Sequence, residues 1–98
     1  MIELRKTAEF VRWLDALADL RARARVQVRI ERLAAGLAGD AKAVGEGVSE
    51  LRIDYGPGYR VYYTQRRGVC VLLLCGGDKR TQARDIARAR ELARVWKE

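Results

Sequence analysis

The sequence predicts an α+β domain in which an N-terminal strand and a helical hairpin precede an antiparallel sheet and a C-terminal helix, in the order β-α-α-β-β-β-α. Apolar residues recur at helical spacing up to residue 37 and again from residue 82. Between residues 50 and 64 they alternate with polar residues, as they do in strands. No linker or repeat divides these runs, so we expect residues 1–98 to form a single domain.

The first half of the chain is expected to hold a short edge strand at residues 2–6 and then two helices. Thr7 is the candidate N-cap of the first helix, whose apolar stripe is Phe10, Trp13, Leu14 and Leu17. Asp19 can cap the second helix, whose stripe is Ala22, Val26, Ile30, Leu33 and Leu37. The short connection between them predicts an antiparallel helical hairpin.

The middle of the chain predicts a loop followed by a β-hairpin. Residues 40–47 are polar and rich in glycine, which is typical of a loop. Gly56-Pro57-Gly58 predicts the turn, with Tyr55 paired to Tyr59 across it. In this register the opposed residues are Leu51 and Tyr63, Ile53 and Val61, Arg52 and Tyr62, and Asp54 and Arg60.

The last third predicts a central strand and a helix. Residues 66–68 are expected to form the next turn. The run Val69–Cys75 is apolar on both faces, so we expect it in the middle of the sheet. Asp78 can cap the final helix, in which Gln82, Ile86, Ala89, Ala93 and Trp96 fall on one stripe. The helices are expected to pack mainly on one face of the sheet.

The composition is that of a folded, strongly basic protein, with 20 Lys and Arg against 13 Asp and Glu and a net charge of +7. This excess favours a polyanionic partner such as a nucleic acid or an acidic protein. The chain has no histidine and no CxxC motif, so we expect no metal site and no cofactor. Five residues separate Cys70 from Cys75, which in a strand places the two thiols on opposite faces, unable to form a disulfide. With no signal peptide and no membrane-spanning run, we expect a cytoplasmic protein without membrane association.

Three basic features are candidates for binding. Arg21, Arg25, Arg29 and Arg32 share one face of the second helix, which is either a solvated surface or a surface for RNA phosphates or an acidic partner. Arg52, Arg60 and Tyr62 share one sheet face, which is either a polar outer face or a site that holds phosphates and unpaired bases. Lys79 and Arg80 follow two glycines at a strand-to-helix junction, where an anion site and an ordinary capped helix start are equally compatible with the sequence.

The segments ELRIDYGPGYRVYYTQ (50–65) and LCGGDKRTQARDI (74–86) resemble the HigB-like branch of the RelE/ParE toxin superfamily, addiction module killer proteins of bacterial toxin–antitoxin systems. The resemblance covers nearly the whole chain. It implies a RelE-like fold and an endoribonuclease, or mRNA interferase, that cuts mRNA on the ribosome and so inhibits translation. It also implies a HigA-like helix-turn-helix antitoxin as partner.

The resemblance implies site positions for Arg52, Arg60, Lys79 and Arg80, and the other candidates come from the residues themselves. The expected catalytic set is Arg52, Arg60, Tyr62, Lys79, Arg80 and Asp85, and the expected RNA-binding set is Arg21, Arg25, Arg29 and Gln82. Two positions depart from the pattern, because Glu50 stands where RelE-type toxins carry a lysine and Asp85 stands near the position of their tyrosine. Glu50, Asp85 and Tyr62 are therefore the candidates for the general base.

Two alternative functions remain open at this point. One is a ParE-like toxin that inhibits gyrase and cleaves nothing. The other is a non-catalytic basic module that binds RNA or an antitoxin.

Overall fold

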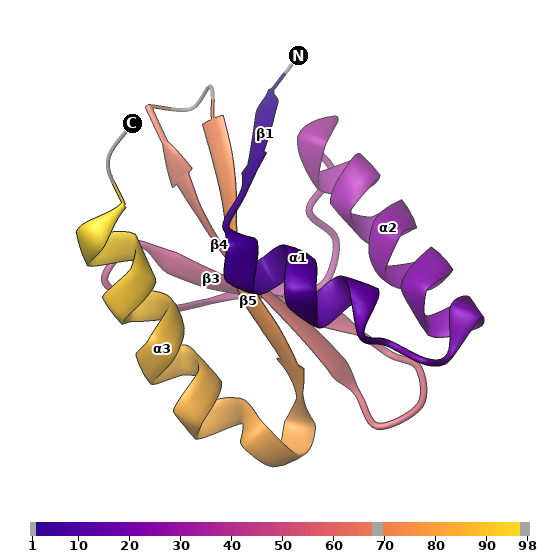
Figure 1. Cartoon of the computed structure of the whole chain (residues 1–98). Helices are drawn as coiled ribbons and strands as arrows, with labels where there is room; N and C mark the ends of the chain where they lie inside the picture. The colour runs from indigo at the N-terminus through magenta and orange to yellow at the C-terminus, as the bar shows by residue number, and fades with distance from the viewer. Residues whose placement is uncertain (1, 68–69, 97–98) are drawn as a thin grey trace.

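In the computed structural model, which describes residues 2–67 and 70–96, a five-stranded mixed sheet carries helices on both faces (Figure 1). The elements are β1 (Glu3–Lys6), α1 (Ala8–Asp15), α2 (Leu20–Ala34), β2 (Ala41–Gly45), β3 (Val48–Ile53), β4 (Tyr59–Arg66), β5 (Cys70–Asp78), the short 3₁₀ helix η1 (Lys79–Thr81) and α3 (Gln82–Val95). The strand order is β1-β5-β4-β3-β2, with β1 parallel to β5 and the other pairs antiparallel. The predicted α+β class is confirmed, and β5 is an inner strand between β1 and β4, although the middle strand of the five is β4. The start of the predicted central strand, Val69, and part of the turn before it lie outside the described residues.

The three predicted caps are confirmed. The Thr7 hydroxyl accepts a hydrogen bond from the Phe10 backbone N–H at 3.0 Å, and the Asp19 carboxylate accepts from the first turn of α2. Asp78 accepts from the Arg80 backbone N–H at 2.8 Å and begins η1 rather than α3 itself. Helix α2 ends at Ala34, so Leu37, expected in its stripe, is exposed.

The expected loop at residues 40–47 contains the strand β2, which sequence reasoning missed. Ala41 pairs with Leu51 and Lys42 with Glu50, and the β2–β3 connection turns through Gly45, Glu46 and Gly47, all at positive φ. The glycines therefore belong to a tight turn between two strands.

The predicted register of the β3–β4 hairpin is wrong by two residues. Leu51 pairs with Val61 and Arg52 with Arg60, because the connection extends from Asp54 to Gly58 and Tyr55 leaves the ladder. A shift by an even number of residues keeps every side chain on its own face. The predicted grouping of Arg52, Arg60 and Tyr62 on one face therefore survives, while their cross-strand partners change.

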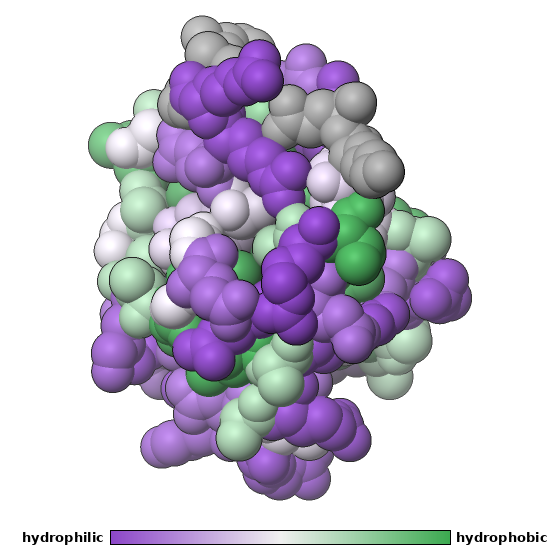
Figure 2. All heavy atoms as spheres, turned by 90° about the vertical axis from the view of Figure 1, so that its left-hand side faces the viewer, coloured by the Kyte–Doolittle hydropathy of each residue, from purple (hydrophilic) through white to green (hydrophobic). Residues whose placement is uncertain are grey.

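Helices cover both sheet faces, which corrects the expectation of a single covered face. Helices α1 and α2 bury one core that includes Phe10, Val26, Ile30, Leu51, Val61 and Leu73. Helix α3 buries a second core made of Val48, Tyr62, Leu72, Leu74, Cys75, Ala89 and Ala93. Because β5 is apolar on both faces, each face needs a cover. The side of the molecule on which α3 lies is mostly hydrophilic, with small hydrophobic patches between (Figure 2).

A β-bulge in β5 corrects the expected placement of the cysteines. Tyr62 pairs with Cys75 and Tyr63 with Leu73, which leaves Leu74 as the additional residue. The bulge changes the parity of the strand, so Cys75 faces α3 on the same side as Cys70 and Leu72. Both thiols are free, as the sequence predicted.

We predict that Gly76→Ala destabilises the fold, because a Cβ at this position would lie 2.2 Å from the Trp13 ring. The expected loss is about 1–3 kcal/mol of unfolding free energy, measured by urea denaturation. In a Trp13→Ala background, the same change is expected to cost much less, since the clashing ring is gone. Equal costs in the two backgrounds would show that the ring does not restrict this position.

Candidate functional site

A polar cleft opens where the β3–β4 connection meets the end of β5. It has a volume of about 360 Å³ and is lined by Asp40, Arg52, Asp54, Gly56, Pro57, Gly58, Arg60 and Lys79. Arg52 and Arg60 face each other across β3 and β4, so both side chains leave the same side of the sheet. The cleft thus gathers three cationic side chains, and two of them are guanidinium groups suited to phosphate oxygens.

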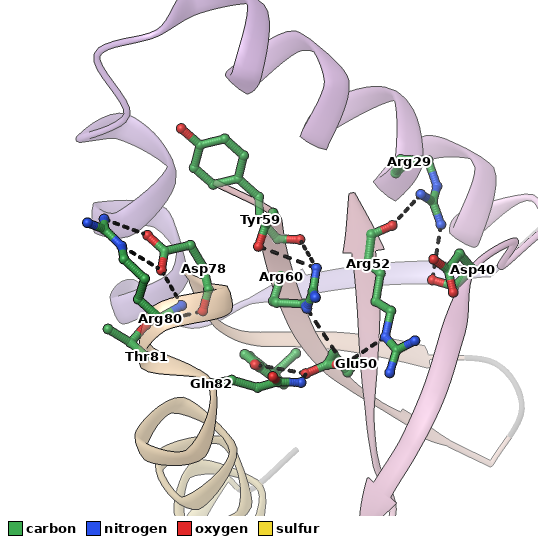
Figure 3. Close-up of polar contacts among 12 residues, drawn as sticks. Arg29, Asp40, Glu50, Arg52, Tyr59, Arg60, Asp78, Arg80, Thr81 and Gln82 are labelled. Atoms are coloured by element: carbon green, nitrogen blue, oxygen red, sulfur yellow. Dashed lines mark hydrogen bonds and ion pairs between the residues drawn. The ribbon is translucent and has the colours of Figure 1, made fainter. Parts of the chain in front are cut away.

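A buried carboxylate lies behind these arginines (Figure 3). Glu50 is fully buried, and its Oε1 accepts a hydrogen bond from Arg52 Nε at 3.0 Å and lies 3.8 Å from Arg60 Nε. Its Oε2 accepts from the Tyr62 hydroxyl at 3.0 Å and from Gln82 Nε2 at 2.7 Å. A single carboxylate therefore connects β3, β4 and the start of α3.

The electrostatic balance at Glu50 favours its ionised form. Burial by itself would raise the pKa of this carboxyl. The hydrogen bonds from Arg52, Gln82 and Tyr62, together with the Arg60 charge, outweigh burial and hold the pKa below its ordinary value of 4.5. Glu50 is thus an anion at neutral pH and is a poor proton acceptor.

Arg60 is held more tightly than Arg52. Its side chain is 12% exposed, against 33% for Arg52. Arg60 Nη1 donates to the carbonyl oxygens of Gly58 and Tyr59, both at 3.3 Å. Its Nε is buried and has no hydrogen bond to any described residue, so the ion pair with Glu50 is what compensates it.

The two basic residues of η1 point in different directions. Lys79 is exposed and lines the cleft. Arg80 donates to Asp78 through both Nε and Nη2, the latter at 3.0 Å, and it does not line the cleft. Figure 3 shows Arg80 beside Asp78, away from Arg52.

Tyr62 and Asp85 lie beneath the site rather than in it. Tyr62 is fully buried, and burial, with the Glu50 charge and hydrogen bond, raises the pKa of its phenol far above 10.0. Asp85 is buried against Gly77, where a Cβ would approach its Oδ2 to 1.9 Å, and it accepts a hydrogen bond from the Thr81 hydroxyl. Neither side chain lines the cleft.

The α2 arginines line a second hollow of about 550 Å³. Its lining comprises Arg21, Ala24, Arg25, Val28, Arg29, Arg32, Ile53 and Asp54, and we call it the α2 groove. Arg29 donates to the carbonyl oxygens of Arg52 and Asp40, which ties α2 to β3. The Arg25 guanidinium lies 4.6 Å from the centre of the Tyr55 ring. Asp54 lines both the cleft and the α2 groove, so the two hollows adjoin.

The structure thus brings together only part of the predicted site. Arg52, Arg60 and Lys79 meet in the cleft, Gln82 contacts Glu50 beneath it, and Arg21, Arg25 and Arg29 line the α2 groove. Sequence reasoning missed Glu50 as the centre of the cluster. A signal was present, since Glu50 and Arg52 are spaced to share the face of β3 that meets Arg60 and Tyr62.

Within residues 2–67 and 70–96, no three potential His, Cys, Asp or Glu ligands come close enough to hold a metal ion. In the same part of the chain, no helix combines the length and apolar character needed to cross a membrane.

Residues 12–94 match the sequence model of the family described as phage derived protein Gp49-like. The chain belongs to this Gp49-like family. It is also 52% identical over 92 residues to an uncharacterized protein of Haemophilus influenzae, covering 94% of this chain and 93% of the relative.

The Gp49-like chain has the same fold as the E. coli toxin RelE. A double mutant of RelE in the free state superposes with a TM-score of 0.73, covering 97% of this chain and 98% of RelE, at 14% sequence identity. The expected RelE-like fold is therefore confirmed. The closer likeness to HigB stays a prediction.

The Glu50 network predicts a defined pH dependence of stability. Because its folded pKa is below 4.5, the ionised carboxylate contributes stability that is fully present above pH 4.5 and is lost as the pH falls through the folded pKa. In urea unfolding from about pH 3 to pH 7, Glu50→Gln is expected to reduce the acid-side slope by up to about 1.4 kcal/mol per pH unit.

Glu31→Gln, which removes an exposed carboxylate from α2, controls for the change in net charge. Parallel curves for the wild type and Glu50→Gln would contradict the inference that Glu50 is stabilised as an anion.

Proposed function

We propose that this Gp49-like protein is the toxin of a type II toxin–antitoxin module and acts as a metal-independent endoribonuclease on mRNA, on the ribosome, thereby inhibiting translation. The observation that carries the proposal is the convergence of Arg52, Arg60 and Lys79 on one cleft, with both guanidinium groups held from behind by a buried anion. The RelE fold and the resemblance to HigB-like toxins support the same function.

The proposed reaction needs no external co-reactant. The ribose 2′-oxygen forms a bond to the adjacent phosphorus, and the bond from phosphorus to the 5′-oxygen breaks. This leaves a 2′,3′-cyclic phosphate and a 5′-hydroxyl end. One proton leaves the 2′-hydroxyl and one is taken up by the 5′-oxygen, so the protons balance.

The cleft residues divide this work by position. Arg52 and Arg60 stabilise the charge that builds on the phosphorane oxygens, which in a site shielded from water contributes several kcal/mol. Lys79, exposed at the rim, supplies the proton to the leaving 5′-oxygen. Arg80 is paired with Asp78 and is placed to attract RNA rather than to contact the reacting phosphate.

The general base is a separate question, since burial removes the first candidates. Glu50 and Tyr62 are fully buried, and Asp85 is nearly so. The carboxylates that line the cleft are those of Asp40 and Asp54. We infer that one of these two groups, or a group of the ribosome, accepts the 2′-hydroxyl proton.

The α2 groove is the proposed docking surface for the antitoxin, of the HigA-like helix-turn-helix type. Its lining combines the apolar Ala24, Val28 and Ile53 with four arginines. Such a surface matches an amphipathic segment with acidic flanks. Arg21 and Arg25 also adjoin the cleft through Asp54, which supports their assignment to RNA binding when no antitoxin is present.

Arg60→Ala is the decisive test of the proposed activity. We expect growth arrest on induction to be lost and cleavage to fall by about 10²- to 10³-fold, because a preorganised positive charge leaves the reacting phosphate. Primer extension after induction should show new 5′ ends at codon-specific positions for the wild type and none for Arg60→Ala.

Arg12→Ala removes an equal charge from an exposed position on α1 and should behave as wild type. Growth arrest that survives Arg60→Ala would refute the nuclease assignment. Double-strand DNA breaks with intact transcripts would instead indicate a gyrase inhibitor.

Binding of the antitoxin should depend on salt. We expect the affinity for the proposed acidic helix-turn-helix antitoxin to fall as ionic strength rises, measured by titration calorimetry. Arg21→Ala and Arg32→Ala should weaken binding and flatten that dependence, since both line the groove. An affinity independent of salt would place the antitoxin on another surface.

A further inference from the structure

The cleft contains an electrostatic problem that the proposed reaction does not explain. Arg52 and Arg60 are directly opposed residues of neighbouring antiparallel strands. At such positions the Cβ atoms lie about 4.5–5.5 Å apart, and two like charges destabilise the pair. Without a bound anion, something within the protein must hold the two guanidinium groups beside each other.

Glu50 meets this need through its place in the sheet. It lies two residues before Arg52 on the same face of β3 and pairs with Tyr62, so Glu50, Arg52, Arg60 and Tyr62 form a square across two strands. Its Oε1 faces both Nε atoms, at 3.0 Å from Arg52 and 3.8 Å from Arg60. A single negative charge thus offsets one of the two positive charges from inside the fold.

The approach through Nε has a consequence for phosphate binding. Glu50 contacts each arginine at the atom closest to the backbone, so it does not occupy the outer Nη ends. Both arginines line the cleft while these inner contacts are made. Arg60 Nη1 also donates to the carbonyl oxygens of Gly58 and Tyr59, so within the described residues Arg60 Nη2 and the two Nη atoms of Arg52 are left for contacts with phosphate oxygens.

The carboxylate itself is held on its other side. Oε2 accepts from the Tyr62 hydroxyl and from Gln82 at the start of α3, so both oxygens are engaged and the group has no exposed surface. Glu50 therefore cannot reach a 2′-hydroxyl in the cleft.

We propose that Glu50 is a positioning residue, a buried carboxylate that aligns Arg52 and Arg60 on the scissile phosphate and offsets their mutual repulsion before RNA arrives. The inference rests on the ribonuclease function proposed above. It assigns Glu50, Tyr62 and Gln82 to the support of the site. Catalytic contact then belongs to Arg52, Arg60 and Lys79.

The test uses single-turnover cleavage of a defined mRNA on programmed ribosomes, with purified toxin in excess. Glu50→Gln keeps the shape of the side chain and removes its charge. We expect the maximal rate to fall about 10- to 100-fold, since a misplacement of about 1 Å costs up to this much. The half-saturating toxin concentration should change less than about threefold. Both limbs of the pH–rate profile should keep their midpoints.

Two further variants separate positioning from general destabilisation. In an Arg52→Ala background, Glu50→Gln should cost much less than in the wild type, because one of the repelling charges is already gone. Glu91→Gln removes an exposed carboxylate on α3 and is expected to leave cleavage unchanged. Circular dichroism confirms that each variant is folded before its rate is measured.

If Glu50→Gln does not fold, Tyr62→Phe provides the alternative test of the positioning role. It deletes one hydrogen bond to Glu50 Oε2 and leaves the buried ring in place. We expect a fall in maximal rate of several fold with an unchanged alkaline limb. Complete loss of cleavage would overturn the proposal, because it would make Tyr62 a catalytic group.

The remaining outcomes are distinct. Wild-type rates for a folded Glu50→Gln would overturn the positioning role while the ribonuclease function stands. Loss of the acidic limb in Glu50→Gln would overturn it as well, by showing that Glu50 is the titrating base. A wild-type protein that cleaves neither free nor ribosome-bound mRNA would refute the proposed function, and the positioning role would fall with it.

Discussion

A charge buried in a protein needs hydrogen-bond and ion-pair partners within the fold, and the Glu50 carboxylate imposes this constraint on the α3 side of the sheet. An unpaired buried carboxylate costs several kcal/mol, so its partners have to be in place whenever the chain is folded. Those partners come from β3, from β4 and from the first residue of α3. The Glu50 charge thus links the first turn of α3 to the geometry of the cleft, in addition to the apolar core that α3 buries.

The bulge in β5 allows this strand to contribute to the core beneath α3 and also to the candidate site. It turns Cys75 toward α3, and the strand then continues into Gly76 and Gly77. Gly77 lies opposite Arg60, and Asp85 occupies the space that a side chain would fill. Absence of a side chain at this point brings the first turn of α3 close to the sheet, which is what places Gln82 within reach of Glu50.

Local features of the fold were readable from the sequence, whereas non-local ones were not. The caps at Thr7 and Asp19 were predicted correctly because each depends on a side chain and the next three residues. The β3–β4 register was not, because alternation has a period of two and any even shift satisfies it equally. Strand β2 was hidden by glycines that serve as a hairpin turn.

The residues of the candidate site show the same difference between features that the sequence reveals and features that depend on distant parts of the chain. Arg52, Arg60 and Lys79 could be identified as a group because the resemblance to HigB-like toxins singled them out, and the structure places them in one cleft. Burial of Tyr62 and Glu50 could not be foreseen, because it results from α3, which begins 32 residues after Glu50 and closes over a face expected to be polar.

The square formed by Glu50, Arg52, Arg60 and Tyr62 also constrains how the sequence of such a site can change in evolution. Replacing Glu50 alone leaves two cations face to face, and replacing either arginine alone leaves the buried anion short of a partner. Each single substitution is thus expected to lower the free energy of unfolding as well as to alter the cleft. Lineages are expected to inherit the four residues as a block or to exchange them together, so a lysine at position 50 would require a cleft rebuilt around a different arrangement of cations.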